Sequence, residues 1–241
     1  MGAEEILSIV TRPISEAVIL MAGKGSRLGM NGVPKPLLQV AGRALISHLI
    51  DALERKGVTT IHAVVGYQMD LLVPGLRAII PAQMELHLIE NHDWHKQNGV
   101  SVLAAAEYVS SQFVLAMSDH IFDAKIVDLL IRSADTTELN VAVDRKLHAI
   151  FDTDDAMKLR TRGDRVIEIG KRLGEYDAID TGLFVCPVGI FEYLRRANRD
   201  GDCSLADGVR LMASDDKVRA VDIGDAWWQD VDTPEMLREA R

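Results

Sequence analysis

A buried strand that leads directly into a cationic glycine loop is the feature that most constrains the fold of this chain. The strand is predicted by an uninterrupted apolar run at residues 17–21. The loop that follows carries glycines and cations at Gly23, Lys24, Gly25, Arg27 and Lys35. Glycines have no Cβ and let backbone N–H groups approach an anion, while the cations add favourable charge. The pattern predicts a phosphate-binding loop after the first strand of an α/β domain.

Two common phosphate-binding loops do not fit this segment. A Walker A loop needs Gly-Lys-Ser/Thr at its end, whereas Lys24 precedes Gly25 here. A Rossmann fingerprint needs glycine where Leu28 stands, and a helix directly after the loop, which Pro34 and Pro36 prevent. The segment is therefore predicted to be neither a kinase-like P-loop nor a dinucleotide-binding loop. An ordinary tight turn is the alternative, which Arg27 and the Pro-Lys-Pro at 34–36 make less favoured.

The order of apolar and amphipathic segments predicts an α/β fold with a mixed, mostly parallel sheet flanked by helices. In the first half we expect strands at 17–21, 60–65, 84–89 and 113–117, and helices at 45–55, 100–109 and 123–133. In the second half we expect strands at 141–144, 157–161, 166–169, 179–186 and 218–223, and helices at 190–197, 205–213 and from Thr233-Pro234 onward. Residues 1–15 are expected to form a flexible segment, and 16–241 a single domain with halves 16–139 and 140–241.

Composition excludes several classes of function. A net charge of -9 argues against a nucleic-acid-binding surface, because such binding depends on neutralising phosphates. Cys186 and Cys203 are too few and too far apart for a disulfide framework or a zinc site, which is typical of a cytoplasmic protein. His92 and His95 lack further ligands at zinc spacing. With no run of 18 apolar residues, we expect no membrane segment.

The loop resembles the opening motif of the nucleotidyltransferases that activate sugar and polyol phosphates, Leu-x-Ala-Gly-x-Gly-Ser/Thr-Arg-Leu/Met followed by Pro-Lys-Pro. Leu20–Leu28 and Pro34–Pro36 match it, with Met21 where alanine is more usual. Further motifs look most like inositol-1-phosphate cytidylyltransferases: Asn98–Ser101, Met117–His120, Ile169–Lys171, Asp180–Gly182 and Trp228–Thr233. The resemblance implies a Rossmann-like GT-A type nucleotidyltransferase fold, with nucleotide bound by the half 16–139 and acceptor by the half 140–241.

The same resemblance implies the nucleotide-binding residues, which are Leu20, Ala22, Gly23, Lys24, Gly25, Ser26, Asn98, Gly99 and Ser101. The amide of Asn98 offers both a donor and an acceptor, as cytosine requires, although the residue could also cap a helix. The choice of CTP over another nucleotide depends mostly on the resemblance.

A Mg²⁺ site is predicted around Asp119, which follows the fourth strand, because ligands collect at the carboxyl ends of strands in such sheets. Mg²⁺ is commonly held by one or two carboxylates together with substrate phosphates. Asp230 or Asp232 would supply the second carboxylate, although Asp232 could instead only cap the last helix. Trp227 and Trp228 are expected to pack in the core beside this carboxylate.

Acceptor contacts are expected in the second half. The resemblance implies that Lys171 binds the acceptor phosphate, with Asp144, Asp180 and Thr181 as candidates for the acceptor's remaining groups. An isolated lysine is more often solvated surface. The position of Lys171 directly after Gly170, followed by Asp180-Thr181-Gly182, favours the functional interpretation.

The reaction implied is attack of the phosphate of inositol 1-phosphate on the α-phosphorus of CTP, giving CDP-inositol and pyrophosphate. Arg27 would hold the β and γ phosphates, Lys35 the α-phosphoryl group and Lys171 the incoming phosphate, with Mg²⁺ on Asp119. No general base is needed, since the acceptor phosphate is already ionised.

Three alternatives stay open. They are a phosphocholine or aminoethylphosphonate cytidylyltransferase, a hexose-1-phosphate nucleotidyltransferase, and a nucleotide-sensing module without turnover. The family resemblance also implies a downstream membrane-bound CDP-alcohol phosphotransferase as a functional partner. The oligomeric state does not follow from the sequence.

Overall fold

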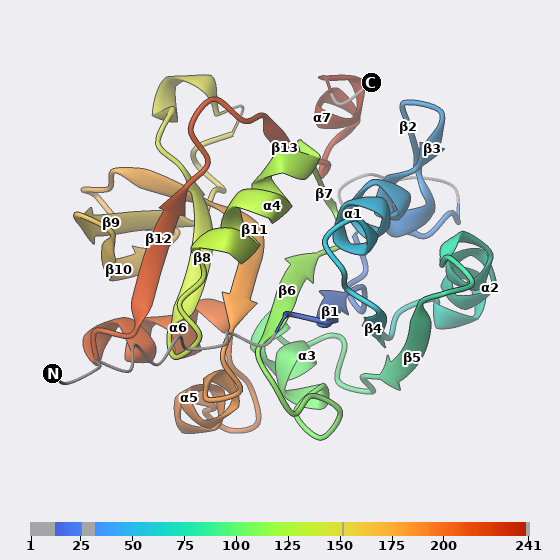
Figure 1. Ribbon diagram of the computed structural model, residues 1–241, viewed down its shortest axis with the longest axis horizontal. Coiled ribbons are helices and arrows are strands. Elements are labelled where there is room, and N and C mark those ends of the chain that lie inside the picture. The colour runs from blue at the N-terminus through green and yellow to red at the C-terminus, as the bar shows by residue number, and fades with distance from the viewer. Residues whose placement is uncertain (1–12, 26–31, 151, 240–241) are drawn as a thin grey trace, which may run out of the picture.

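A nine-stranded mixed sheet forms the centre of the protein, whose computed structural model describes residues 13–25, 32–150 and 152–239. Its strands lie in the order β5-β4-β1-β6-β11-β8-β12-β10-β9 (Figure 1). The first four are mutually parallel and come from the first half of the chain: β1 (Glu16–Leu20), β4 (Thr60–Val65), β5 (Glu85–Glu90) and β6 (Phe113–Met117). Parallel strands covered on both faces are continuously apolar, as β1 is after its first residue, Glu16.

The second half extends the same sheet with strands of mixed direction. They are β8 (Leu139–Asp144), β9 (Lys158–Arg162), β10 (Arg165–Gly170), β11 (Ala178–Cys186) and β12 (Val218–Asp222). β11 runs antiparallel to β6 and to β8, while β12 runs parallel to β8. β11 therefore joins the two halves in one sheet, and its first residues also pair with β9.

Helices cover both faces of the sheet, because side chains of the central strands alternate between two cores. Val18 and Leu20 of β1 face one core, and Ala17 and Ile19 face the other. The first core is completed by α3 (Asn98–Ala104), α5 (Ile190–Ala197) and α6 (Leu205–Ser214). The second is completed by α1 (Leu45–Glu54), α2 (Met69–Ile79) and α4 (Ala124–Ser133). Among the described residues, no helix combines the length and apolarity needed to cross a bilayer.

A third, smaller core brings distant parts of the chain to the carboxyl end of β6. Its members are Leu38, Val40, Leu45, Ile121, Val231 and Leu237. Leu38 follows the 3-10 helix η2 (Lys35–Leu37), Val40 lies in β2 (Gln39–Val40), and Leu45 begins α1 directly after β3 (Arg43–Ala44). Ile121 lies in β7 (His120–Phe122), Val231 follows β13 (Trp228–Asp230), and Leu237 lies in α7 (Pro234–Glu239). A second 3-10 helix, η3 (Leu147–Ala149), follows β8. This core fixes residues 35, 119–120 and 230–232 side by side.

Most predicted elements are confirmed, but the short pair β2–β3 and the 3-10 helices η2 and η3 were not predicted, and there are three larger differences. The predicted helix 100–109 is wrong in its limits, since α3 covers Asn98–Ala104. Helix α2 was not predicted, because Pro74 and Gly75 lie inside it and both disfavour helix interiors. Gly75 is needed there, since a Cβ would lie 2.5 Å from Leu37 Cδ1. The two-stranded pair β7–β13 was also missed, because three-residue strands carry too little pattern.

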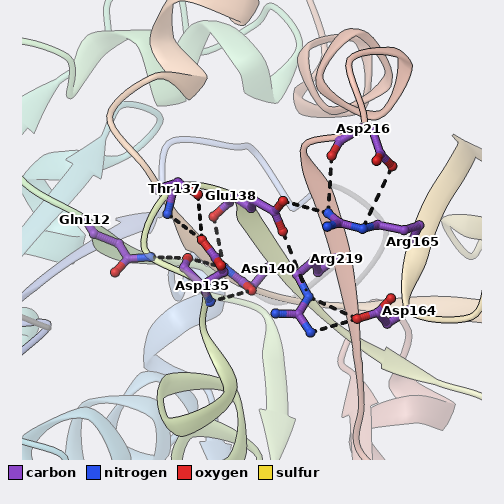
Figure 2. Close-up of polar contacts among 9 residues, drawn as sticks. All are labelled: Gln112, Asp135, Thr137, Glu138, Asn140, Asp164, Arg165, Asp216 and Arg219. Atoms are coloured by element: carbon purple, nitrogen blue, oxygen red, sulfur yellow. Dashed lines mark hydrogen bonds and ion pairs between the residues drawn. The ribbon is translucent and has the colours of Figure 1, made fainter. Parts of the chain in front are cut away.

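A network of charged residues ties the strands together at the opposite end of the sheet from β7 and β13. Figure 2 shows Glu138 between two guanidinium groups. Arg165 Nη1 donates to Glu138 Oε1 at 2.7 Å, and Arg219 donates to Asp164 through two nitrogens at 2.7 and 3.1 Å. The network joins the start of β8 and of β12 to the β9–β10 hairpin, far from the carboxyl end of β6.

Candidate active site

Two carboxylates and one ammonium form the centre of the site. Lys35 Nζ donates to Asp119 Oδ2 at 2.8 Å and also to Asp232 Oδ1. β7–β13 pairing creates this contact, because Asp230 lies opposite His120 in the ladder and Val231 N donates to the Asp119 carbonyl at 2.8 Å. The predicted association of Asp119 with the acids at 230 and 232 therefore agrees with this geometry.

Electrostatics favour the charged forms of Lys35 and Asp119. Burial alone would lower the pKa of Lys35, but the adjacent Asp119 and Asp232 outweigh it and raise that pKa above its usual value. Burial would raise the pKa of Asp119, yet Lys35 and then His120 hold it well below its usual range. Asp230 differs, since burial raises the pKa of its carboxyl. The lysine and Asp119 are thus charged across the physiological range.

Asp232 is not the cap of the last helix. The hydroxyl of Thr233 accepts a hydrogen bond from Met236 N at 3.3 Å and so caps α7, while the Asp232 carboxylate faces Lys35. The alternative that Asp232 serves only as a cap is therefore wrong.

One cavity, of about 230 Å³, lies over the glycine loop. It is lined by Leu20, Met21, Ala22, Gly23, Gly25, Lys35, Pro36, Trp94, Lys96, Asn98, Ser101, Met117, Ser118 and Asp119. Gly25 has φ +56, a left-handed conformation that suits glycine, and its Cα faces the Lys35 side chain. Of the nucleotide residues predicted in the strand and loop, Leu20, Ala22, Gly23 and Gly25 line this hollow. Lys24 differs, because its Nζ lies 5.8 Å from the centroid of the Tyr67 ring instead of lining the hollow.

The helix predicted to hold the base contributes two of its three residues. Asn98 Oδ1 accepts from Leu205 N at 2.8 Å, so this residue ties α3 to α6 and does not cap its own helix. Ser101 accepts from Asn91 Nδ2 at 3.0 Å and still reaches the hollow. Gly99 does not, because it faces the backbone of the segment before α6, where a Cβ would lie 2.6 Å from the Cys203 carbonyl oxygen.

A second cavity, of about 260 Å³, lies beside the first. Its polar lining includes Asp119, His120, Asp152, Asp155, Lys171, Asp180, Asp230 and Asp232. Lys171 Nζ donates to Asp155 Oδ1 at 2.5 Å. Burial raises the pKa of Asp180 to about 6, although the Gly182 N–H that donates to it at 2.7 Å acts in the other direction. Lys171 and Asp180, predicted as acceptor residues, both line this cavity.

Two predicted acceptor residues do not reach the cavity. Thr181 is fully buried, because side chains alternate along β11, and its hydroxyl donates to the Ala142 carbonyl at 2.9 Å. Asp144 is buried behind Trp228 and accepts from its Nε1 at 2.9 Å. Direct contact of either residue with an acceptor is therefore wrong in this structure.

The two cavities meet at Asp119, Asn98 and Met117, which line both. Asp119 is therefore within reach of a ligand in either cavity. Arg27 and Ser26, predicted to bind nucleotide phosphates, lie outside the described residues.

The donor set fits a hard divalent cation. The carboxylates of Asp119 and Asp232 already converge on one cation, the ammonium of Lys35, so the pair is arranged to hold positive charge. Oxygen ligands of this kind suit Mg²⁺ when substrate phosphates complete the coordination. Within the part of the chain that the structure describes, no group of three His, Cys, Asp or Glu side chains forms a metal site by itself.

His120 and Trp94 belong to the site although sequence reasoning assigned them no role. The His120 ring is stacked on Trp228, with centroids 5.8 Å apart, and Trp94 packs against Tyr67 at 5.1 Å. The motif Ser-Asp-His contained the signal for His120, whereas the position of Trp94 follows only from the fold. Trp228 packs beside the carboxylates as predicted, but Trp227 is 45% exposed and does not.

Comparison with known proteins adds independent findings. Residues 17–168 match the MobA-like NTP transferase domain family. A Rubrobacter xylanophilus protein named bifunctional IPC transferase and DIPP synthase is 38% identical over 225 residues, which are 92% of this chain and 50% of that protein. The CMP-5'-(3-aminopropyl)phosphonate synthase of Streptomyces rubellomurinus is 30% identical over 246 residues, covering 93% of this chain and 38% of that protein.

Among solved structures, the inositol-1-phosphate CTP transferase from T. maritima superposes with a TM-score of 0.82 at 26% identity. The superposition covers 95% of this chain and 97% of that one. The chain therefore spans about half the length of the Rubrobacter relative but nearly all of the T. maritima structure.

Proposed function

Since this chain belongs to the MobA-like NTP transferase domain family, we propose that it transfers CMP from CTP to the phosphate of a polyol phosphate, with inositol 1-phosphate as the preferred acceptor. The observation that carries the proposal is the meeting of two cavities at Asp119. One contains the glycine loop and the other contains Lys171, so two phosphorylated substrates would meet at one carboxylate. The name of the T. maritima relative supports this choice of nucleotide and acceptor.

The first cavity suits a nucleoside triphosphate. Gly23 and Gly25 leave backbone N–H groups accessible to phosphate oxygens, and Lys35 stands between the loop and Asp119. Asn98 uses its oxygen within the protein, while its Nδ2 makes no hydrogen bond among the described residues. We propose that this amide donates to an acceptor atom of the cytosine ring, N3 or O2.

The second cavity suits a polyhydroxylated phosphate. Carboxylates accept hydrogen bonds from hydroxyl groups, and Asp152 and Asp180 both line this cavity. Lys171 supplies the cation for the acceptor phosphate. In the free protein its partner is Asp155, which the phosphate would replace.

The reaction follows from this arrangement by direct displacement. An oxygen of the acceptor phosphate forms a bond to the α-phosphorus of CTP, and the bond from that phosphorus to the bridging oxygen breaks, leaving its electron pair on pyrophosphate. Lys35 neutralises the α-phosphoryl group and Arg27 the departing phosphates. Mg²⁺, held by Asp119 and Asp232 with Asp230 beside them, would stabilise charge on the phosphates when bound. No side chain needs to take up a proton. The product would pass to a CDP-alcohol phosphotransferase.

An aminoalkyl phosphonate is the second candidate acceptor. An ammonium group would also be attracted by Asp152 and Asp180, and the Streptomyces relative is named for a product of this kind. Both candidate acceptors would place their phosphorus group at Lys171. They differ in the group that would contact Asp152 and Asp180, which is a hydroxyl in one case and an ammonium in the other.

A panel of acceptors tests the proposal. Pyrophosphate release is measured with CTP, Mg²⁺ and, in turn, inositol 1-phosphate, phosphocholine, aminoethylphosphonate and glucose 1-phosphate. We expect release with inositol 1-phosphate above all others. Release with aminoethylphosphonate alone would favour the second candidate. CTP binding without release for any acceptor would contradict both and favour a sensing module.

The role of Lys171 is tested in the same assay with a matched control. Lys171→Met should raise the KM for the acceptor at least tenfold, on the order of 1.4 kcal/mol, and leave the KM for CTP unchanged. Lys217→Met is the control, because Lys217 lies over the Tyr193 ring directly before β12 and lines neither cavity. An unchanged acceptor KM in Lys171→Met would contradict the assignment.

A further inference from the structure

A continuous series of side-chain contacts leads from behind the acceptor cavity to Asp119. Lys146 Nζ donates to Asp144 Oδ1 at 2.8 Å, and Trp228 Nε1 donates to Asp144 Oδ2 at 2.9 Å. The Trp228 ring is stacked on His120, with an interplanar angle of 7°. His120 Nδ1 lies 2.8 Å from Asp119 Oδ1, and because a carboxylate only accepts, this nitrogen is the donor.

Each member of this series is held in one orientation. Gly182 lies close against the His120 ring, since a Cβ there would lie 2.9 Å from Nε2. Its φ of +77 also favours glycine at this position. Lys146 is fixed by the carbonyls of Gly224 and Ala226, at 2.6 and 3.2 Å. The ring of His120 therefore has little freedom to turn away from Asp119.

The two oxygens of Asp119 are consequently divided between two partners. Lys35 takes Oδ2, and His120 takes Oδ1. Outer partners of this kind orient a metal-binding carboxylate, and their loss typically weakens metal affinity or activity 10- to 100-fold. A buried acid such as Asp144 is also costly unless its hydrogen bonds are satisfied, and here both oxygens are occupied.

We infer that Asp144 and Trp228 are positioning residues that act through His120 to set the orientation of the Asp119 carboxylate for a divalent cation and the nucleotide phosphates. None of the three needs to contact a substrate for this role. The inference rests on the proposed function, because it concerns the metal-binding carboxylate of the same site.

Binding of Mn²⁺ as a spectroscopic substitute for Mg²⁺ tests the inference without turnover. The dissociation constant is measured by electron paramagnetic resonance with and without CTP, in the absence of acceptor. His120→Leu should weaken Mn²⁺ binding about 10- to 100-fold. His120→Asn should recover most of the affinity, because its amide nitrogen can take the place of Nδ1 as donor to Asp119.

Variants of Trp228 separate the stacking contact from the hydrogen bond. Trp228→Phe keeps an aromatic ring against His120 but loses the donor to Asp144, so a smaller loss of Mn²⁺ affinity is expected than for Trp228→Leu. Trp227→Phe is the matched control, because that exposed neighbour forms no side-chain hydrogen bond or ring stacking with Asp144, Trp228 or His120 among the described residues. This variant should bind Mn²⁺ as the wild type does. In the pyrophosphate assay, the half-saturating metal concentration should rise in the same order.

The possible results separate this inference from the proposed function. Folded Trp228→Leu and His120→Leu variants that bind Mn²⁺ like the wild type would overturn the inference and leave the function untouched. A wild type that releases no pyrophosphate with any acceptor would contradict the function, while the Mn²⁺ measurements would still decide the inference. If His120→Leu does not fold, Trp228→Phe decides: unchanged Mn²⁺ affinity in that variant overturns the inference.

Discussion

Replacing Lys35 with methionine removes the cation on which Asp119 and Asp232 converge, while keeping a side chain of similar length. The Lys35 side chain is only 11% exposed, so the effect should be large. Breaking a buried ion pair by removing one partner costs about 3 to 5 kcal/mol of stability. Asp119 is 32% exposed and recovers hydration, so we expect Lys35→Met to lower the free energy of unfolding by about 1 to 3 kcal/mol.

The effect on catalysis should exceed what the loss of stability explains. A charged contact that acts on the transferring phosphoryl group contributes about 3 to 4 kcal/mol to transition-state stabilisation. The kcat of folded Lys35→Met should therefore fall roughly 100- to 1000-fold. Divalent metal with CTP should restore part of the lost stability, because the metal supplies positive charge to the same carboxylates.

The stability difference should also depend on pH. Lys35 lowers the pKa of Asp119, so the stability that this pair contributes is present above the unfolded pKa of aspartate, about 3.9, and is lost as the pH falls below it. The difference between wild type and Lys35→Met should therefore be constant near neutral pH and shrink in acid.

Urea unfolding at pH 7 and pH 3, with and without Mg²⁺ and CTP, measures the stability, and pyrophosphate release measures kcat. Lys125→Met is the control, because Lys125 forms an exposed pair with Asp123. Wild-type turnover in Lys35→Met, or a stability loss equal to that of Lys125→Met, would refute the reasoning.

Three further predictions concern single residues. Asp180→Asn should raise the free energy of unfolding by about 1 to 3 kcal/mol at pH 8 and have little effect at pH 4. Burial raises the Asp180 pKa to about 6, so the stability linked to its proton is lost as the pH rises through that value. Urea unfolding at both pH values measures the difference, and a destabilised variant at pH 8 would contradict the prediction. Gly99→Ala should lower the free energy of unfolding by about 1 to 3 kcal/mol, because the Cβ of the new alanine would meet the Cys203 carbonyl. An unchanged melting temperature would contradict this and show that α3 can shift to make room. Arg165→Ala should lower stability by about 1 to 3 kcal/mol through the loss of its bond to Glu138, without changing kcat; altered kcat would mean that the charged network in Figure 2 communicates with the site.

The fold was largely predictable where local pattern and tertiary environment agree. The strands around Ile19, Val64 and Leu115 are continuous apolar runs because helices cover both sides of the sheet. The predicted GT-A type fold is confirmed by the superposition with the T. maritima structure. Helix α2 could not be predicted from the sequence, because Pro74 lies inside it. Helix propensity alone argues against proline at such a position, and the helix there depends on tertiary packing.

The site was predictable only to the level of the motifs. Asp119 and Lys35 could be identified because they stand at the end of a strand and in the loop segment. The occlusion of Thr181 could not, because it depends on which face of β11 meets the cavity. The position of Asp144 behind Trp228 is likewise set by pairing between strands more than 100 residues apart in sequence.

Transfer of label from CTP tests the central claim most directly, because it follows the α-phosphorus itself. Protein in excess is mixed with CTP labelled at the α-phosphorus, with and without inositol 1-phosphate. The account predicts labelled CDP-inositol and pyrophosphate only when the acceptor is present, and no label on the protein. Label retained on the protein, or intact CTP after mixing with acceptor, would contradict it.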